Sequence, residues 1–311
     1  MIKISVFIPT FNPDIDRLNQ TLIGLKKQNF PLIEWELILV DNNSQTSFIG
    51  LIDISWHNNS RIVKEPKPGL TYARIKGFQE SQADLIIMVD DDNILSPDYL
   101  LNTYFCFKNN KNLGAVGGKS IPQFDFEPPT WLNQFHSSLA LRNLGEEIRI
   151  GKWENIYPEF APIGAGMALR KSALVNYIKK IEVEKDNIID RQGTSLSSGG
   201  DNDMVIEILK AGWEIAYSPA LSLTHIIPLA RTDKYYLSKL NRDSTKSWIL
   251  LLEKHNINPW IKISKWTIPL RKIKAWLVYK PWRSESDYIR FKGACGLYEA
   301  LGMLTSKQKF K

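Results

Sequence analysis

The most informative stretch of this sequence is Leu85-Ile-Ile-Met-Val-Asp-Asp-Asp-Asn93. Its first five residues are apolar, which predicts a short buried strand, and three carboxylates follow where that strand should end. Adjacent acids repel one another, so the cluster costs stability unless a cation binds there. Oxygen ligands of this kind suit a hard divalent ion such as Mg²⁺ or Mn²⁺, which can hold a substrate diphosphate. The stretch therefore predicts an enzyme that uses a nucleotide-activated donor.

Around this stretch, strands and helices alternate. The predicted strands are Ile2–Pro9, Glu34–Val40, Arg61–Lys64, Leu85–Val89 and Ala115–Ser120, and the predicted helices between them are Asp14–Gln28, Leu70–Ser81 and Pro97–Lys108. This order predicts an α/β protein with a mostly parallel central sheet flanked by helices. Ligands of such sheets bind at the carboxyl ends of the strands. Thr10, Asp41 and Asp90–Asp92 all fall at or just after such ends.

The pattern changes after residue 120. We expect helices at Trp131–Leu144, at Asp201–Ala211 and at about 232–254, 260–280 and 285–303, with short strands at Glu214–Tyr217 and Leu221–Thr224. Gly164–Met167 is a small-residue stretch that lets the backbone approach a ligand closely. Gly193–Gly200 is rich in Gly and Ser and predicts a loop.

Size and composition are those of a globular protein. The chain has 311 residues, of which 43% are hydrophobic and 23% charged. The longest apolar runs are too short for a transmembrane helix, and the first residues do not resemble a signal peptide. The two cysteines, Cys106 and Cys295, are expected to be reduced thiols of a cytoplasmic protein, and they are too few for a cysteine-based zinc site.

Taken together, several segments resemble the inverting glycosyltransferases of family 2, which have the GT-A fold. These segments are Val6-Phe-Ile-Pro-Thr-Phe-Asn12, Val40-Asp-Asn-Asn-Ser44, Gly69-Leu-Thr-Tyr-Ala-Arg74, Val89-Asp-Asp-Asp92, Gly117-Gly118, Gly164–Met167, Gly200-Asp-Asn-Asp203, and His225 followed by Arg231. The resemblance covers roughly residues 3–230. It implies a catalytic domain over 1–230, with a nucleotide-sugar half to about residue 120 and an acceptor half to 230, followed by a helical region over 231–311.

The resemblance also implies roles on the donor side. Asp41 would contact the base or ribose, near Pro9, Thr10 and Asn12, and Arg74 would face the phosphates or ribose. Asp90 and Asp91 would bind the donor, and Asp92 would hold Mn²⁺ or Mg²⁺ below the diphosphate. His225 would be a further metal or diphosphate ligand, and Arg231 a diphosphate contact. The alternatives are turn, cap and surface roles for the same residues.

On the acceptor side, Asp201 would act as the general base that deprotonates the attacking hydroxyl. Asp203 is the alternative base, or it positions the acceptor, because the family motif usually has an acid where this chain has Gly200. Asp201 also suits a helix N-cap. Trp131, Gly166 and Met167 would contact the acceptor, although a core position is an equal alternative for Trp131.

The positive charge is concentrated at the end of the chain. Residues 260–311 contain twelve Lys or Arg and three Asp or Glu, a net charge of +9 against +7 for the whole chain. Tryptophans alternate with these cations over 260–283, a pattern that suits the headgroup region of an anionic membrane. We therefore expect a cytoplasmic protein docked on the inner face of the plasma membrane. A solvated helix face is the alternative, and nucleic acid is not an expected partner because no binding motif is present.

The expected activity is non-processive transfer of a sugar from a nucleotide-diphospho-sugar, with UDP favoured, to a glycan or lipid-linked saccharide in bacterial surface polysaccharide synthesis. A polysaccharide synthase is disfavoured because the sequence has no Gln-x-x-Arg-Trp motif. A sugar nucleotidyltransferase is a second hypothesis, but Pro9–Pro13 contains neither the glycines nor the basic residue of its phosphate loop. An inactive nucleotide-sugar-binding homologue is the third.

Overall fold

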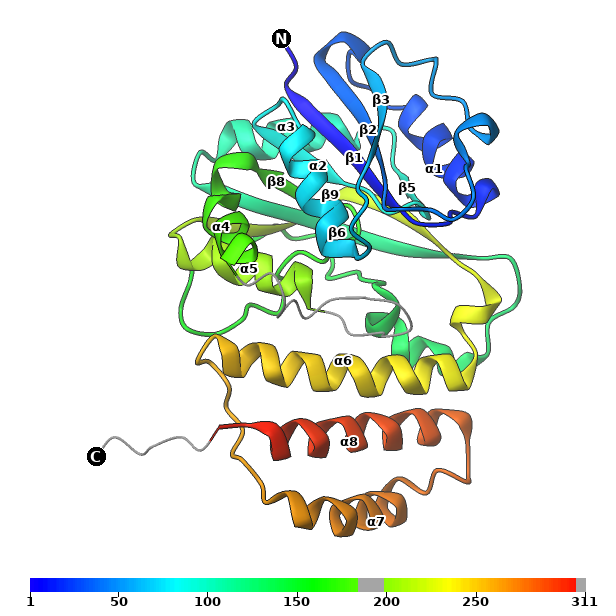
Figure 1. Ribbon diagram of the computed structural model, residues 1–311, viewed down its shortest axis with the longest axis vertical. Helices are drawn as coiled ribbons and strands as arrows, with labels where there is room; N and C mark the ends of the chain where they lie inside the picture. Colours follow the sequence, from blue (N-terminus) through cyan, green and yellow to red (C-terminus); the bar gives the residue numbers. More distant parts are fainter. Residues whose placement is uncertain (184–198, 306–311) are drawn as a thin grey trace. The chain divides into compact units, whose positions relative to one another are not determined.

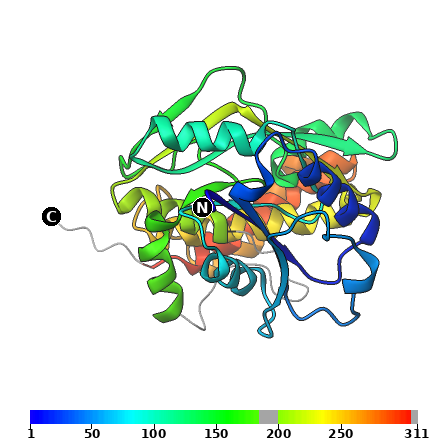
Figure 2. The same ribbon diagram turned by 90° about the horizontal axis from the view of Figure 1, so that it is seen from above.

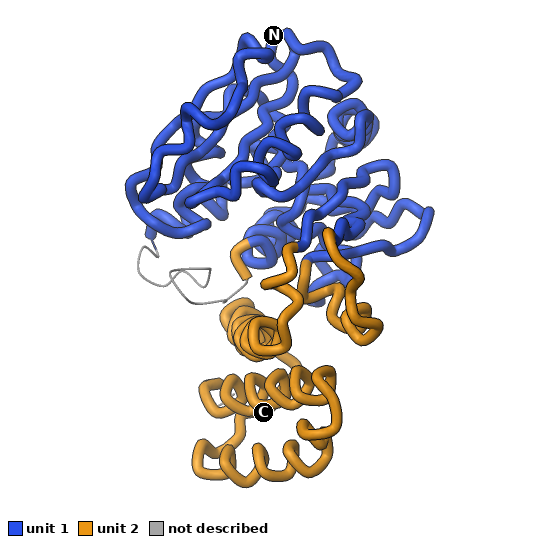
Figure 3. The backbone as a smooth tube through the Cα atoms, turned by 90° about the vertical axis from the view of Figure 1, so that its right-hand side faces the viewer, with its two compact units in different colours: residues 1–124, 140–188, 201–227 blue, residues 125–139, 189–200, 228–311 orange. Residues whose placement is uncertain are grey.

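The computed structural model describes residues 1–183 and 199–305. The chain divides into two compact units, which Figure 3 shows in different colours. The first comprises residues 1–124, 140–188 and 201–227, and the second comprises residues 125–139, 189–200 and 228–311. Most of the expected loop over Gly193–Gly200 lies outside the described residues.

The first unit is built on a nine-stranded sheet in the order β3-β2-β1-β4-β8-β6-β9-β5, with β7 paired to β9. β1, β2, β3 and β4 are mutually parallel, so their carboxyl ends meet at one edge. The pairs that β5, β7 and β8 form are antiparallel, and β6 with β9 is parallel. The strands are Ile4–Thr10 (β1), Trp35–Asp41 (β2), Ser60–Lys64 (β3), Leu85–Met88 (β4), Asn93–Leu95 (β5), Leu113–Phe124 (β6), Arg149–Gly151 (β7), Ala168–Arg170 (β8) and Glu214–Ile227 (β9).

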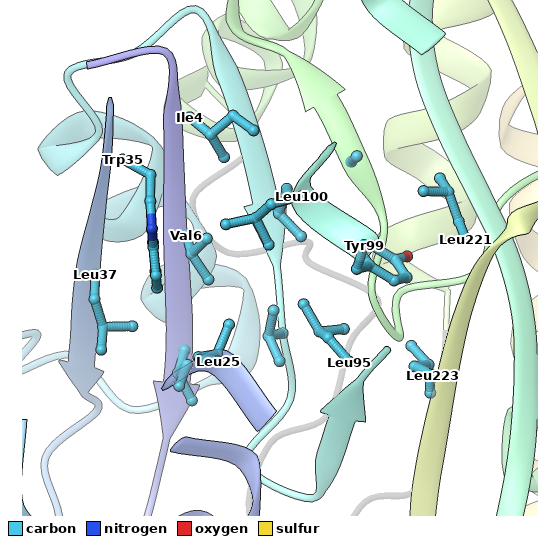
Figure 4. Packing of buried hydrophobic residues seen from close by; sticks show 14 of the residues in the cluster. Ile4, Val6, Leu25, Trp35, Leu37, Leu95, Tyr99, Leu100, Leu221 and Leu223 are labelled. Atoms are coloured by element: carbon cyan, nitrogen blue, oxygen red, sulfur yellow. The ribbon is translucent and has the colours of Figure 1, made fainter. Parts of the chain in front are cut away.

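Helices cover both faces of this sheet (Figures 1 and 2). One buried cluster joins β1 side chains such as Ile4 and Val6 to α1 and α3, and Figure 4 shows Leu25, Tyr99 and Leu100 within it. A second cluster lies on the other face and contains side chains of α2, α4 and α5. The helices of this unit are Ile15–Lys26 (α1), Leu70–Glu80 (α2), Tyr99–Asn109 (α3), Val175–Val183 (α4) and Gly200–Lys210 (α5), with short 3-10 turns at Leu32–Glu34 (η1), Ile49–Leu51 (η2) and Lys171–Leu174 (η4).

Two predicted elements differ from the structure. The helix expected at Trp131–Leu144 is a 3-10 helix, Thr130–Leu139 (η3), because Ala140 adopts a left-handed φ of 56° and Arg142 then pairs with Ser120. The two short strands expected between residues 214 and 224 are one strand, β9. Its register against β6 shifts between Tyr217 and Ser222, so the intervening residues are accommodated without ending the strand.

The second unit consists mainly of three helices, Lys234–Lys254 (α6), Ile268–Tyr279 (α7) and Glu285–Met303 (α8). α8 packs against both α6 and α7, and in Figure 1 it lies between them. Asp233 and Ser284 cap α6 and α8 with side-chain hydrogen bonds. The remaining 3-10 turns are Leu229–Arg231 (η5) and Lys265–Thr267 (η6). Among the described residues, no helix combines the length and apolar character that a membrane crossing requires.

Gly166 is a glycine at which both the backbone conformation and the close neighbours oppose a side chain. Its φ is +72°, and an added Cβ would lie 2.5 Å from Leu223 and 2.7 Å from the Tyr99 hydroxyl, which donates to the Gly166 carbonyl at 2.6 Å. Gly166→Ala should therefore lower the free energy of unfolding by about 2–4 kcal/mol, measured by urea denaturation. Gly145→Ala is the control because its φ is +90° but no atom lies within 4 Å, so it should cost only about 1 kcal/mol. Equal losses would contradict the steric argument.

Candidate active site

The carboxyl ends of β1, β2 and β4 bring polar side chains to one edge of the sheet. Thr10 is opposite Asp41 in the β1–β2 register. The Thr10 hydroxyl donates to Asp91 Oδ2 at 2.5 Å, which ties the end of β1 to the acidic segment after β4. Thr10 and Asp41 are buried, whereas Asp90 and Asp91 are half-buried. The structure therefore brings together residues that are far apart in the sequence and for which the sequence predicts donor contacts.

Asp92 and His225 form a buried pair at this edge. His225 lies opposite Asn93 in the β5–β9 pairing, and the Ile226 N–H donates to the Asp92 carbonyl at 2.9 Å. His225 Nε2 lies 3.4 Å from Asp92 Oδ1, with both side chains about 5% exposed. The carboxylates of Asp91 and Asp92 are oxygen ligands of the kind that Mn²⁺ and Mg²⁺ prefer, and the His225 imidazole lies beside Asp92.

The loops that follow β1 and β2 are held together by side-chain hydrogen bonds. Asp41 Oδ1 accepts the Ser44 N–H at 2.9 Å, and the Ser44 hydroxyl accepts the Asn12 N–H at 2.9 Å. Asn12 Oδ1 in turn accepts the Gln45 N–H at 2.8 Å. Pro9 is a buried strand residue. Asp41 therefore forms the predicted turn, and this local hydrogen bond fixes the direction of its carboxylate.

The segment Gly164–Met167 adjoins the end of β4. The Met88 N–H donates to the Met167 carbonyl at 2.9 Å, two residues before Asp90. The Met167 side chain is fully buried in the core cluster below α2, α4 and α5, and Gly166 is held by Tyr99. At the end of β4, this segment therefore presents its main chain, whereas the side chain of Met167 points into the core.

Arg74 and Asp201 meet around Gly164. The Gly164 N–H donates to Asp201 Oδ2 at 2.9 Å. A Cβ added to Gly164 would lie 2.8 Å from Arg74 Nη2 and 3.2 Å from Asp201 Oδ2, so only glycine lets these two side chains approach so closely. Arg74 is buried and belongs to α2, whereas Asp201 is half-buried in the first turn of α5. The predicted donor contact and the predicted base are thus neighbours.

Two residues that the sequence did not indicate surround Asp201. The Tyr157 hydroxyl donates to Asn202 Oδ1 at 2.6 Å. Burial raises the pKa of Tyr157, and the charge of Asp201 raises this pKa further, so the hydroxyl stays protonated and remains a donor. Arg142 binds the carbonyls of Glu159 and Ala161 and thereby holds the segment that leads to Gly164. Neither residue lies in a recognisable motif.

Asp203 has a different environment from Asp201, although both belong to α5. Lys180 Nζ lies 2.6 Å from Asp203 Oδ1 and 2.7 Å from Glu207 Oε1, and all three side chains are largely buried. Burial alone would lower the pKa of Lys180, but the two carboxylates outweigh it and raise the pKa. Residues two apart on a helix point about 200° away from each other, which explains the separation.

Trp131 and Arg231 belong to the second unit. Trp131 is half-buried in η3 and packs edge to face on Phe135, with ring centroids 6.0 Å apart. Arg231 ends η5, where its N–H donates to the Pro228 carbonyl. Their predicted roles toward acceptor and diphosphate stay predictions.

The mixed sheet with helices on both faces and an acidic strand end agrees with the predicted α/β fold of the GT-A type. The chain is similar over 97% of its length to crystal structures of S. aureus TarS 1–349 in complex with UDP and with UDP-GlcNAc, with TM-scores of 0.52 and 0.53 and 15% identity, covering 90% and 91% of those chains. This likeness confirms the predicted fold. The chain belongs to glycosyl transferase family 2, whose family model matches residues 5–177.

Curated relatives agree with this family. The chain is 27% identical over 135 residues to a glucosyl-dolichyl phosphate glucuronosyltransferase of Haloferax volcanii, and 27% identical over 137 residues to the poly(ribitol-phosphate) beta-N-acetylglucosaminyltransferase TarP of Staphylococcus aureus. Each match covers 41% of this chain, and 41% and 42% of the respective relative. The matched region therefore spans less than half the length of these relatives.

The Lys180 ion pairs should stabilise the attachment of α4 to α5. Lys180→Met leaves two buried carboxylates without their common cation, so the free energy of unfolding should fall by about 2–4 kcal/mol in urea denaturation at pH 7. Because the folded pKa of Lys180 is raised, its contribution is complete below the unfolded pKa of about 10.4 and is lost only as pH rises through the folded value.

The neighbouring exposed Lys179 provides the control for this experiment. Lys179→Met should change the free energy of unfolding by less than about 0.5 kcal/mol. The difference between the two variants should be constant from pH 6 to about pH 9. A loss of the difference within that range would show that the ion pairs do not stabilise the fold.

Proposed function

We propose that the protein transfers a sugar from a nucleotide-diphospho-sugar, with UDP as the favoured nucleotide, to a hydroxyl group of a glycan or lipid-linked saccharide in surface polysaccharide synthesis. The observation that carries the proposal is the meeting of Arg74, Gly164 and Asp201 next to the acidic end of β4. The Arg74 guanidinium and the Asp201 carboxylate lie 2.8 Å and 3.2 Å from the position that a Cβ on Gly164 would occupy. A cation for the donor phosphates and a base for the acceptor hydroxyl are thus close together. Relatives whose names describe glycosyl transfer support the same reaction class.

Donor binding is proposed for the edge formed by β1, β2 and β4. Asp41 would accept hydrogen bonds from the base or ribose, because its carboxylate is buried and held by Ser44. Asp90 and Asp91 would contact ribose or phosphate-bound groups beside Thr10. Asp92 and His225 would hold a divalent ion, whose chemistry is to neutralise charge on the leaving diphosphate. Arg74 would add a planar, permanently charged donor to the phosphates.

Asp201 is the proposed general base. Its carboxylate is half-buried and accepts hydrogen bonds from the N–H groups of Gly164 and Asn202, which fix its direction. It would take the proton from the acceptor hydroxyl as that oxygen attacks the anomeric carbon on the face opposite the diphosphate, so configuration inverts. Asp203 is a weaker candidate, because Lys180 already binds its carboxylate. Gly166 is proposed on the acceptor side.

Product analysis tests the reaction class directly. Purified protein incubated with UDP-sugars and Mn²⁺ should release UDP, by slow hydrolysis when no acceptor is present. Release of pyrophosphate from UTP and a sugar phosphate would instead identify a nucleotidyltransferase. If neither product forms and nucleotides do not raise the melting temperature, both enzyme assignments are wrong.

Asp92→Ala should weaken metal-dependent binding of UDP. Removing one ligand of the proposed pair should raise the Kd for UDP in Mn²⁺ by roughly 10–100-fold, measured by isothermal titration calorimetry. Binding without metal should change little. The exposed Asp84, which pairs with Arg170 away from the strand end, provides the control variant Asp84→Ala. An unchanged Kd for Asp92→Ala in Mn²⁺ would remove Asp92 from the metal site.

Asp201→Asn should keep donor affinity but lower the rate of transfer by roughly 10²–10⁴-fold, because an amide cannot take up the proton of the attacking hydroxyl group. Asp203→Asn should mainly reduce stability by weakening the Lys180 ion pair, with transfer reduced less than about tenfold. Both rates and the UDP Kd should be measured on the same preparations. If Asp203→Asn is the more damaging change for transfer, the base assignment must be reversed.

A further inference from the structure

The second unit contains a long segment without acidic residues. Between His255 and Ser284 the sequence has no Asp or Glu. The same segment contains seven cations, which are Lys262, Lys265, Arg271, Lys272, Lys274, Lys280 and Arg283. Six of them are exposed, and Lys272 is partly covered, with its Nζ 2.7 Å from Glu299 Oε1. This surface therefore attracts anions, and α7 is its only α-helix among the described residues.

α7 packs on α8 through one face only. Ala275 is buried on that face, and Ile268 and Lys272 are half-buried there, at the three- and four-residue spacing of one helical stripe. The opposite face of an ordinary surface helix is polar. In α7 it is apolar: Leu270, Ile273 and Leu277 follow the same spacing and are 62%, 58% and 57% exposed. The helix thus has one face covered by the unit and an opposite, exposed apolar stripe.

Cations and aromatic rings border the exposed stripe. On the helix surface, Lys274 lies beside Leu270 and Leu277, given 100° per residue. Lys280 follows the helix as its left-handed C-cap and is exposed. Trp276 and Trp282 contact each other with tilted rings, whose centroids are 4.3 Å apart, and both side chains are about half exposed. Tryptophan and lysine beside aliphatic side chains are the composition of helices that lie in the headgroup layer of a membrane.

We infer that α7 lies flat on an anionic lipid bilayer, with Leu270, Ile273 and Leu277 entering the boundary between headgroups and acyl chains. The surrounding lysines and arginines contact the lipid phosphates. The helix is too short to cross the bilayer, which agrees with the absence of a membrane-crossing helix among the described residues.

The positive charge around the exposed stripe of α7 favours a lipid surface over a second copy of this chain as the partner that covers it. A symmetric contact through the exposed stripe would place two acid-free, basic segments against each other. Like charges opposed across an interface disfavour association. An anionic bilayer instead supplies compensating charge over the whole surface, and each basic residue near it contributes to binding.

Flotation of the full chain with vesicles tests this inference. We expect binding to vesicles of equal parts phosphatidylglycerol and phosphatidylcholine, and none to pure phosphatidylcholine. The triple variant Leu270→Ser, Ile273→Ser, Leu277→Ser should bind at least about tenfold more weakly. The charge variant Lys262→Gln, Lys274→Gln, Lys280→Gln should lose roughly fivefold per residue, on the order of 100-fold in all.

Matched controls change equally exposed residues elsewhere. Ile23→Ser, Ile33→Ser, Ile148→Ser removes three exposed apolar side chains, and Lys26→Gln, Lys27→Gln, Lys111→Gln removes three exposed cations. Both controls should bind vesicles like the unchanged chain, with circular dichroism confirming that every variant is folded. Equal losses in the controls and the α7 variants would overturn the inference.

Analytical ultracentrifugation provides the remaining outcome. If the unchanged chain fails to float with anionic vesicles and instead forms a dimer that the α7 apolar variant abolishes, the stripe is a contact between copies. Vesicle binding is measured without donor or acceptor. Its failure therefore leaves the proposed transfer reaction unaffected, and an inactive protein that floats would leave this inference intact.

Discussion

Two main-chain hydrogen bonds at the end of β4 determine where the chemistry of the first unit is placed. The Val89 N–H donates to the Phe7 carbonyl at 3.0 Å, and the Met88 N–H donates to the Met167 carbonyl at 2.9 Å. The first bond aligns the acidic segment with the end of β1, and the second brings the Gly164–Met167 turn beside it. A shift of one residue in this register would turn each side chain to the other face of the sheet. The acids, Arg74 and Asp201 therefore share one region because β4 has neighbours on both sides.

The sequence was sufficient for this edge because its signals are local. A short apolar run followed by Asp90–Asp92 predicts both a buried strand and its end, and the same reasoning applies to Thr10 and Asp41. The prediction failed where tertiary pairing decides the structure. The sequence predicts two short strands, at Glu214–Tyr217 and Leu221–Thr224, yet the bulge lets β9 continue along β6. Trp131–Leu144 has helical spacing, but the pairing of Arg142 with Ser120 extends the backbone there instead.

Residues that surround the proposed base could not be predicted, since their partners are far away in the sequence. Tyr157 reaches Asn202 over 45 positions, and Lys180 reaches Asp203 over 23. The motif Gly200-Asp-Asn-Asp203 alone leaves two candidate carboxylates. Tertiary structure distinguishes their environments, because one faces a backbone N–H beside Arg74 and the other faces a buried lysine. A carboxylate already compensated by a lysine is held in place and is a poorer proton acceptor.

The same distinction between composition and packing applies to the second unit. Tryptophans and lysines over 260–283 predict an interfacial segment, but composition does not reveal which side of the helix is available. The answer depends on α8, which covers the stripe through Ala275 and leaves the stripe through Ile273 exposed. Three large aliphatic side chains are exposed to water on one face of this helix. Burying each of them would be favourable by roughly 1.5–3 kcal/mol. The surface of α7 combines these exposed aliphatic side chains with a net positive charge. It is therefore stabilised by surroundings that are both apolar and anionic, and the headgroup layer of an anionic membrane meets both conditions.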